Sequence, residues 1–302
     1  MSKKEIWATM VTPFKEDYSV DYEALEKLIE WYIANGVDGL FAACQSSEIF
    51  YLTLDEREKI TRFVVEKTKG RVPVVSSGHT AAEPAEQIKE LRRIADCGVN
   101  AVVLISNRLA KKDQDDEVWK GNAQYLLDGL PDVPVGIYEC PYPYKRLLTP
   151  ELIKWCSEQE RFVFIKDTCC DVEQISRRIE AAEGRIKIYN ANSATFLESV
   201  RAGADGFCGV MANFCPKLFS YLAQNWELEP KKAEIIQDFI TAASFAEMQQ
   251  YPLNAKYFLK LEGVPMDIYT RCRDEGEWKR LQELETRAFR RNYMEFLKNQ
   301  GL

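Results

Sequence analysis

The chain repeats one short junction three times, as Asn35-Gly-Val-Asp-Gly39, Cys97-Gly-Val-Asn-Ala101 and Ala202-Gly-Ala-Asp-Gly206. In each copy a glycine ends a segment of helical period, and a short apolar run begins three residues later. Glycine is common just after a helix because it adopts the left-handed conformation without steric strain. The junction therefore predicts a helix that is followed closely by a strand, at three places in the chain.

Eight short apolar runs alternate with longer segments of helical period. The runs are continuously apolar, which is typical of parallel strands that are buried on both faces. Eight strand–helix units over about 225 residues favour an α/β fold of the (β/α)8 TIM-barrel type. An open doubly wound sheet is the alternative, but no G-x-G-x-x-G follows the first run, which weakens a dinucleotide-binding interpretation. The predicted strands are Glu5–Val11, Gly39–Ala43, Val72–Ser76, Ala101–Ile105, Val133–Tyr138, Phe162–Lys166, Ile186–Asn190 and Gly206–Val210.

The predicted helices have recognisable starts. Thr53 and Glu56 have the spacing of a capping box, and Thr149 places a cap residue before a proline at the first helical position. After Trp226 the pattern changes to helix alone. We therefore predict a barrel catalytic domain over residues 1–226 and a C-terminal helical extension over residues 227–302, packed on the barrel or on a neighbouring subunit. The helical stretches of this extension are Pro230–Gln250, Pro252–Leu261 and Glu275–Lys298, the last with Trp278, Leu281, Leu284 and Ala288 at helical spacing.

Composition and charge exclude several classes of protein. Of the 302 residues, 46% are apolar and 29% are charged, a balance typical of a globular protein with a sizeable core. The net charge is −7, and Lys and Arg form no cluster of the kind that binds nucleic acid. The first residues lack the hydrophobic region of a signal peptide, and no apolar run approaches the roughly 20 residues that span a bilayer. We expect a cytoplasmic protein without nucleic-acid or membrane partners.

The cysteines and the single histidine offer little for a metal site. No pair of the nine cysteines has C-x-x-C spacing, and Cys169 and Cys170 are adjacent. We interpret the nine as reduced thiols in a reducing compartment. With His79 as the only histidine, a zinc site or a Ser-His-Asp triad has few residues to use. No metal is therefore expected.

Two strand ends carry candidate catalytic groups, because active sites of such barrels lie at the carboxyl ends of the strands. Lys166 follows an apolar run, so its amine is expected in a poorly hydrated barrel mouth, where desolvation favours the neutral, nucleophilic form that can condense with a ketone. Alternatively, Lys166 pairs with the adjacent Asp167. Tyr138 ends another strand, where a phenol can relay protons or can simply fill the barrel with its hydroxyl bonded to backbone.

Further polar residues follow other strands. Gln45, Ser46 and Ser47 supply polar side chains and backbone N–H groups in a turn that can hold a small carboxylate, although an ordinary polar turn is the alternative. Asn190, at the end of the seventh run, and Cys208, within the eighth, are further candidates for contact with substrate. Glu48 follows Ser47 in the turn after the second run. It is interpreted either as a base or, more simply, as an acid that braces the loop.

These motifs together resemble those of the dihydrodipicolinate synthase and N-acetylneuraminate lyase superfamily of class I, Schiff-base-forming enzymes. The resemblance covers nearly the whole chain. Lys166 follows Tyr138 by 28 residues, which is the separation of the lysine and tyrosine in that family. The matching segments are Ala8-Thr-Met-Val-Thr-Pro-Phe14, Gln45-Ser-Ser-Glu48, Tyr138-Glu-Cys-Pro141, Phe164-Ile-Lys-Asp167 and Met211-Ala-Asn-Phe-Cys-Pro216.

The resemblance implies a role for each matching residue. Lys166 would form an imine with pyruvate or with the 2-oxo group of the substrate, and Tyr138 would relay protons at the reacting bond. Ser46 falls at a loop threonine that binds the substrate carboxylate, while Gln45 and Ser47 replace a threonine and a glycine of the family pattern. No metal or organic cofactor is implied. A homotetramer built from two dimers is implied.

Departures from the pattern narrow the expected reaction. Pro143 occupies the position of an arginine that grips the second substrate in the synthase, and Leu109 that of a tyrosine supplied across a subunit interface. Ala194 and Val210 replace sugar-binding residues of the sialic-acid lyase. We therefore expect an aldolase, lyase or dehydratase that acts on pyruvate or a 2-oxo-3-deoxy sugar acid. The alternatives are a divergent dihydrodipicolinate synthase and, from another class, a non-catalytic ligand-binding barrel.

Overall fold

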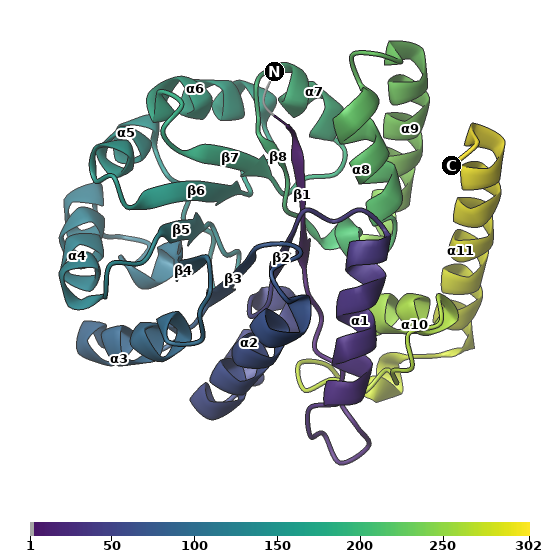
Figure 1. Ribbon diagram of the computed structural model, residues 1–302, viewed down its shortest axis with the longest axis horizontal. Coiled ribbons are helices and arrows are strands. Elements are labelled where there is room, and N and C mark those ends of the chain that lie inside the picture. The colour runs from purple at the N-terminus through teal and green to yellow at the C-terminus, as the bar shows by residue number, and fades with distance from the viewer. Residues whose placement is uncertain (1–2) are drawn as a thin grey trace.

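Eight parallel strands close into a barrel in the computed structural model, which describes residues 3–302 (Figure 1). Each strand pairs with the next along the chain, and β1 also pairs with β8, which closes the ring. The (β/α)8 barrel predicted from the sequence is confirmed. The strands are β1 (Glu5–Thr9), β2 (Gly39–Phe41), β3 (Val74–Ser77), β4 (Ala101–Ile105), β5 (Val135–Tyr138), β6 (Phe162–Asp167), β7 (Lys187–Asn190) and β8 (Gly206–Phe207).

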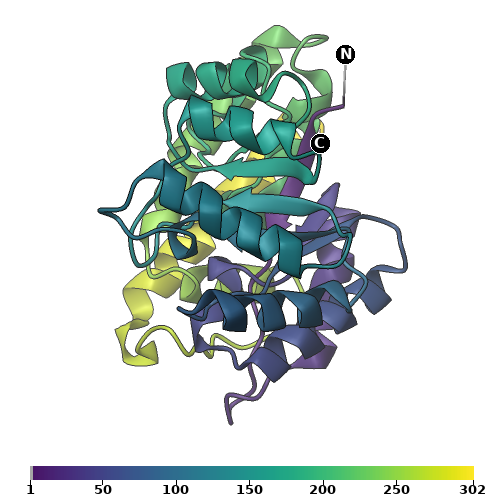
Figure 2. The ribbon, with the colours of Figure 1, turned by 90° about the vertical axis from the view of Figure 1, so that its left-hand side faces the viewer.

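Helices between the strands form an outer layer around the barrel (Figure 1, Figure 2). The predicted caps are confirmed: Thr53 and Glu56 form a capping box, and the Thr149 hydroxyl accepts a hydrogen bond from Leu152 N (3.2 Å). The helices are α1 (Tyr22–Ala34), α2 (Leu54–Thr68), α3 (Pro84–Ala95), α4 (Asp116–Gly129), α5 (Pro150–Glu158), α6 (Val172–Ala182), α7 (Phe196–Arg201) and α8 (Pro216–Asn225), with 3-10 turns η1 (Gln45–Ser47), η2 (Ile49–Tyr51), η3 (Ser106–Arg108) and η4 (Val210–Asn213).

The repeated junction has the same geometry at its three sites. Gly36 has a left-handed φ of +81°, which confirms the helix stop predicted there. Asp38 then bonds twice to the first residues of the preceding strand: its N–H donates to Ile6 O (2.7 Å), and its carboxylate accepts from Ile6 N (2.9 Å). Each junction thereby aligns the starts of two neighbouring strands. The other two sites pair Asn100 with Val74 after Gly98, and Asp205 with Ile188 after Gly203.

Aromatic side chains fill the amino-terminal end of the barrel interior. The Trp7 ring lies 6.1 Å from the Phe164 ring and 5.9 Å from the Tyr189 ring, measured between centroids. The Tyr189 hydroxyl bonds to Glu5 at the start of β1. This packing closes the amino-terminal end of the barrel. The polar residues that follow the strands lie at the opposite, carboxyl end, where the sequence predicted the active site.

The C-terminal helices share their core with the barrel. Buried side chains of the last three helices belong to one apolar cluster that also includes residues of α1 and α8. Phe239 stacks on Phe296 with ring centroids 4.2 Å apart. None of the helices within residues 3–302 is long and apolar enough to cross a membrane. These C-terminal elements are α9 (Pro230–Ala243), η5 (Ser244–Met248), α10 (Leu253–Leu261), η6 (Glu275–Glu277) and α11 (Arg280–Gln300).

The last helix starts later than the sequence pattern predicted. It begins at Arg280 rather than at Glu275, and Trp278 has an extended backbone. The Asp274 carboxylate accepts a hydrogen bond from Gly276 N (2.8 Å), which turns the chain into η6 before the helix begins. A side chain that bonds its own nearby backbone competes with helix formation. The helical spacing that included Trp278 was therefore wrong for that residue.

Candidate active site

Tyr138 and Lys166 are neighbours in the barrel wall. They are register partners on β5 and β6, and each is only 4% exposed. Lys166 Nζ lies 4.3 Å from the centroid of the Tyr138 ring and 5.9 Å from that of Phe41. Among residues 3–302, no side chain or carbonyl accepts a hydrogen bond from this amine. The structure thus brings together the amine and the phenol that the sequence singled out.

A buried ion cluster holds β5 and β6 from behind. Side chains alternate between the faces of a strand, so Glu139 and Asp167 point away from the barrel interior. Arg178 of α6 bonds to Asp167 and, at 3.2 Å, to Glu139. Burial, with the nearby charge of Asp167, raises the pKa of Glu139 to about 7. Asp167 therefore pairs with Arg178, and the alternative that it pairs with Lys166 is wrong.

The loop after β2 lies beside Tyr138. Gln45 Oε1 accepts hydrogen bonds from the Tyr138 hydroxyl (3.4 Å) and from Cys140 Sγ (3.4 Å). The Ser46 hydroxyl donates to Thr9 Oγ1 (3.3 Å) at the end of β1. Gln45 and Ser46 both line the cavity that contains Lys166. Both side chains therefore line the same cavity as the Lys166 amine, with hydrogen bonds to their neighbours in the barrel.

Three other predicted substrate contacts lie outside the lining of that cavity. The Ser47 hydroxyl donates to Cys44 O (2.8 Å), within its own loop. The Asn190 amide donates to two hydroxyl groups of the α7 segment, each at 3.0 Å. Cys208 is 2% exposed, and burial raises the pKa of its thiol to about 12. These three side chains therefore do not line the cavity that contains Lys166, whereas Gln45 and Ser46 do.

Glu48 braces the loop, as one interpretation of the sequence suggested. Its carboxylate is fully buried and forms an ion pair with the fully buried Lys256 (2.7 Å). It also accepts hydrogen bonds from the Thr270 hydroxyl (2.8 Å), Arg271 N (2.6 Å) and Cys272 N (3.0 Å). With its acceptor capacity filled in this way, Glu48 fixes the loop to the C-terminal part of the chain.

Two residues of the C-terminal part lie close to the Lys166 cavity, although nothing in the sequence marked them. The Tyr251 hydroxyl accepts a hydrogen bond from Asn213 (3.2 Å), and its side chain lines the cavity beside Ser46. The Glu247 carboxylate accepts a hydrogen bond from the Ser193 hydroxyl (3.0 Å), and burial raises its pKa to about 7. Neither residue belongs to a recognisable motif, because tertiary packing alone carries both segments to the barrel mouth.

The cavity at the carboxyl end of the barrel has a volume of ≈ 600 Å³. This lies within the range of roughly 300–1,000 Å³ that small-molecule sites occupy. Its lining combines aromatic with charged side chains. No group of three or more His, Cys, Asp or Glu side chains within residues 3–302 is arranged to hold a metal ion. The lining residues are Gln45, Ser46, Glu48, Phe50, Tyr51, Tyr138, Pro141, Tyr142, Lys166, Val210, Tyr251, Pro252, Cys272, Arg273, Asp274 and Glu277.

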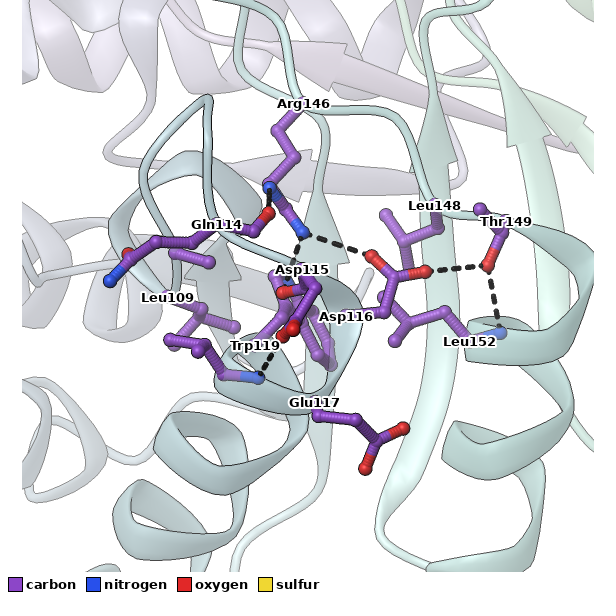
Figure 3. Close-up of polar contacts among 12 residues, drawn as sticks. Leu109, Gln114, Asp115, Asp116, Glu117, Trp119, Arg146, Leu148, Thr149 and Leu152 are labelled. Atoms are coloured by element: carbon purple, nitrogen blue, oxygen red, sulfur yellow. Dashed lines mark hydrogen bonds and ion pairs between the residues drawn. The ribbon is translucent and has the colours of Figure 1, made fainter.

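The cations next to Pro143 are engaged elsewhere. Arg146 bonds to Asp116 Oδ1 (2.9 Å), and Thr149 donates to the other oxygen of the same carboxylate (2.9 Å), as Figure 3 shows. Lys145 donates to a backbone carbonyl after β6 (2.7 Å). Neither cation lines the cavity, so neither replaces the arginine that is missing at Pro143.

Leu109 is also enclosed within its own chain. It is 0% exposed, and its carbonyl accepts a hydrogen bond from Asn122 (2.7 Å) of α4. The position where the resemblance places a tyrosine that crosses a subunit interface is therefore part of the core.

Comparison with known proteins gives a consistent result. The model of the dihydrodipicolinate synthetase family matches residues 2–274. The chain is similar to the 4-hydroxy-tetrahydrodipicolinate synthase of Oceanobacillus iheyensis, with 28% identity over 273 residues that cover 88% of this chain and 90% of the relative.

Solved structures share the fold at lower identity. The dihydrodipicolinate synthase DapA-2 from Bacillus anthracis has a TM-score of 0.87 and 21% identity, covering 96% of this chain and 98% of its own. YagE, a prophage protein from E. coli K12 solved in complex with pyruvate, has a TM-score of 0.84 and 21% identity, covering 99% of each chain. These likenesses show the fold.

Proposed function

The chain belongs to the dihydrodipicolinate synthetase family, an enzyme family of Schiff-base-forming lyases, and we propose that Lys166 is the amine that forms the Schiff base. The substrate is pyruvate or a 2-oxo-3-deoxy sugar acid. The observation that carries this proposal is the placement of Lys166 Nζ 4.3 Å from the centroid of the Tyr138 ring, inside a cavity at the carboxyl end of the barrel.

The proposed chemistry begins with addition of the Lys166 amine to the 2-oxo carbon. The resulting carbinolamine loses its hydroxyl as water and becomes an imine. Burial raises the pKa of the Tyr138 phenol well above its usual value near 10, so the phenol stays protonated and is able to donate a proton to the departing hydroxyl. The same group takes a proton back when water later hydrolyses the imine.

The imine then acts as an electron sink. In aldol cleavage, the C3–C4 bond breaks, its electron pair enters the imine as an enamine, and the C4 hydroxyl loses its proton to give an aldehyde. Protonation of the enamine at C3, followed by hydrolysis, releases pyruvate. In dehydration, the imine acidifies C3, and a hydroxide leaves from the neighbouring carbon as water after protonation.

The loop after β2 is the proposed carboxylate site. Ser46 offers a hydroxyl, Gln45 offers an amide, and both line the cavity next to Lys166. Backbone N–H groups of such a turn add fixed donors for an anion. This arrangement would orient the 2-oxo group toward the amine.

A divergent 4-hydroxy-tetrahydrodipicolinate synthase is the second candidate, favoured by the names of the relatives. Its second substrate carries a carboxylate, and the nearby Arg146 is held by Asp116 instead of facing the cavity. A non-catalytic ligand-binding barrel is the third candidate. A binding protein would not require a nearly buried lysine, Lys166, next to the phenol of Tyr138, which argues against this candidate.

The experiment is a parallel activity screen that uses mass spectrometry to detect products. One arm supplies 2-oxo-3-deoxy sugar acids, and the other supplies pyruvate with aspartate semialdehyde. We expect pyruvate and an aldehyde, or a dehydrated acid, in the first arm at a rate well above that of the second. Equal or faster turnover in the second arm would replace the proposal with the synthase, and absence of turnover in both would favour a binding protein.

We also propose that copies of the chain assemble, as a tetramer built from two dimers. Four large apolar side chains of the C-terminal part would stand in water on a single chain. They are Phe245, Met248, Leu281 and Leu284, which are 69%, 84%, 59% and 49% exposed.

We further propose a reducing, cytoplasmic location, which the nine free cysteines support. The boundary of the barrel domain at residue 226 remains a prediction.

A further inference from the structure

Residues 270–277 form a fixed segment across the barrel mouth, which we call the strap. Glu48 receives three hydrogen bonds from its first residues, as described above. Arg271 adds an ion pair to Glu56 (2.6 Å) and donates to the carbonyls of Tyr18 (2.7 Å) and Tyr51 (3.0 Å). These contacts anchor the strap to the loop that carries Ser46, the proposed ligand of the substrate carboxylate. The strap and the carboxylate site are therefore held in a fixed position relative to each other.

Arg273 is the cation that the strap presents to the cavity. Its Nε donates to Tyr251 O (2.6 Å), and its Nη1 bonds to Gln250 Oε1 (3.3 Å) and approaches Glu277 Oε2 (3.5 Å). Within residues 3–302, Nη2 has no hydrogen-bond partner. The Arg273 side chain is 41% exposed, whereas Lys166 is 4% exposed, so the lysine lies at the inner end of the cavity and Arg273 lies at its mouth.

The charges of the strap favour a particular kind of ligand. Arg273 is accompanied in the lining by two carboxylates, those of Asp274 and Glu277. A hydroxyl group both donates and accepts hydrogen bonds, so two adjacent hydroxyls match a guanidinium beside a carboxylate. A second carboxylate on the substrate would meet two carboxylates, Asp274 and Glu277, against the single guanidinium of Arg273. The net charge of this subsite is therefore negative, which disfavours an anionic tail in a partly enclosed site.

We propose that the strap is the specificity-determining subsite for the far end of the substrate, with Arg273 and Glu277 bonded to adjacent hydroxyls of an uncharged tail. The inference rests on the proposed function and deepens it, since it selects 2-oxo-3-deoxy acids that end in neutral hydroxyl groups over those that end in a second carboxylate. Arg273 and Glu277 bind and position the tail, while the chemistry takes place at Lys166.

The test compares two substrates with four variants. The substrates are 2-oxo-3-deoxygluconate, whose tail is uncharged, and 2-oxo-3-deoxyglucarate, whose tail ends in a carboxylate. The variants are Arg273→Gln, Arg273→Lys, Glu277→Gln and the matched control Arg291→Gln, an exposed arginine of α11 away from the cavity. Trapping of pyruvate on Lys166 with borohydride is measured in parallel, because pyruvate has no tail.

The wild-type enzyme is expected to prefer the uncharged tail by at least tenfold in kcat/KM. Both Arg273 variants should lower kcat/KM for that substrate at least tenfold relative to their rate of pyruvate trapping, mainly through KM. Glu277→Gln should shift the preference toward the dicarboxylic substrate by at least threefold, which a merely structural role would not do. The control should leave the preference unchanged.

Several results would overturn the inference. A wild-type preference for 2-oxo-3-deoxyglucarate would do so, as would Arg273 variants whose kcat/KM falls only in proportion to pyruvate trapping. If pyruvate is trapped on Lys166 but neither sugar acid is turned over, the strap assignment fails while the imine stands. If pyruvate is not trapped at all, the proposed function fails as well.

Discussion

The amine of Lys166 and the phenol of Tyr138 are held by strand register rather than by a flexible loop. They are directly paired residues on adjacent strands, and the neighbouring Glu139 and Asp167 are fixed by Arg178 on the opposite face. A register shift of one residue would turn either group to the wrong face. This rigidity suits a reaction in which proton transfer requires a well-placed donor.

Replacement of Tyr138 by Phe tests the proton relay. We expect kcat to fall by about 10²–10⁴-fold, the usual contribution of a general acid–base group. Steady-state kinetics on the substrate found in the activity screen gives the value. Tyr125→Phe, at an exposed tyrosine on α4, is the matched control and should change kcat by less than about twofold. A similar rate for Tyr138→Phe and the control would remove the phenol from the mechanism.

Glu247→Gln tests the effect of a buried carboxyl on stability. Burial raises the pKa of Glu247 from 4.5 to about 7, so the folded state binds a proton more tightly than the unfolded state does. The contribution of this group to stability is therefore fully present below pH 4.5 and is lost as pH rises through 7. The glutamine variant lacks this loss, and relative to wild type it should gain on the order of 1–2 kcal/mol between pH 5 and pH 8, after allowance for partial exposure.

Urea denaturation at a series of pH values measures this difference. The amide can still accept the hydrogen bond from Ser193, so the change isolates ionisation. A stability difference between variant and wild type that is the same at pH 5 and pH 8 would contradict the assignment.

The residues of the site differ in how far the sequence could predict them. Lys166 and Tyr138 lie at the ends of strands, Gln45 and Ser46 follow a strand, and the barrel rule places strand ends together. Arg273, Asp274, Glu277 and Tyr251 come from irregular segments whose position depends on contacts such as those of Glu48, more than 200 residues away in the chain. Local patterns carry no information about such contacts.

At the scale of elements, β5, β6 and α6 act as one unit through the buried cluster of Glu139, Asp167 and Arg178. Their side chains are 0%, 0% and 3% exposed. A buried cation between two carboxylates neutralises charges that would otherwise be expensive to bury. The cluster therefore sets both the stability of this part of the barrel and the position of the residues next to it.

Arg178→Met is expected to destabilise the protein by about 3–5 kcal/mol, because it leaves two buried carboxylates without their cation. Chemical denaturation measures the loss. The matched control is Arg177→Met on the same helix, where an exposed pair with Glu173 contributes no more than about 0.5 kcal/mol. Equal effects of the two substitutions would show that the cluster does not hold the strands.

Elements were predictable where local chemistry and tertiary structure agree. All eight predicted strands exist, because a continuous apolar run buried on both faces has few other solutions. The helix predicted from Glu275 starts at Arg280, since the Asp274 carboxylate accepts a hydrogen bond from Gly276 N and the Trp278 ring packs on Tyr257, with 5.3 Å between ring centroids. The helical spacing of apolar residues in the sequence does not reveal either contact.

At the scale of the whole molecule, the C-terminal part of the chain has two structural roles. It shares the apolar core with α1 and α8, and it delivers Tyr251 and the strap to the barrel mouth. It also leaves apolar groups in water, among them Phe245, which lines a groove with Glu285 and Ala288 of α11. The same elements are thus placed to shape the site and to meet another copy of the chain.

The double variant Met248→Glu/Leu284→Glu tests the proposed assembly. We expect wild type to have the mass of a tetramer by light scattering, and the variant to have the mass of a dimer or monomer, because charges at an apolar interface oppose association. Tyr125→Glu, at an exposed aromatic residue of α4, should leave the mass unchanged. A wild-type monomer, or a variant of unchanged mass, would contradict assembly through this surface.

The central claim is tested most directly by trapping the imine. The protein is incubated with pyruvate, reduced with sodium borohydride and mapped by peptide mass spectrometry, alongside Lys166→Ala and the control Lys154→Ala at an exposed lysine of α5. The account predicts a stable adduct on Lys166 in wild type and in the control, and none in Lys166→Ala. An adduct on another lysine, or no adduct with pyruvate or longer 2-oxo acids, would contradict it.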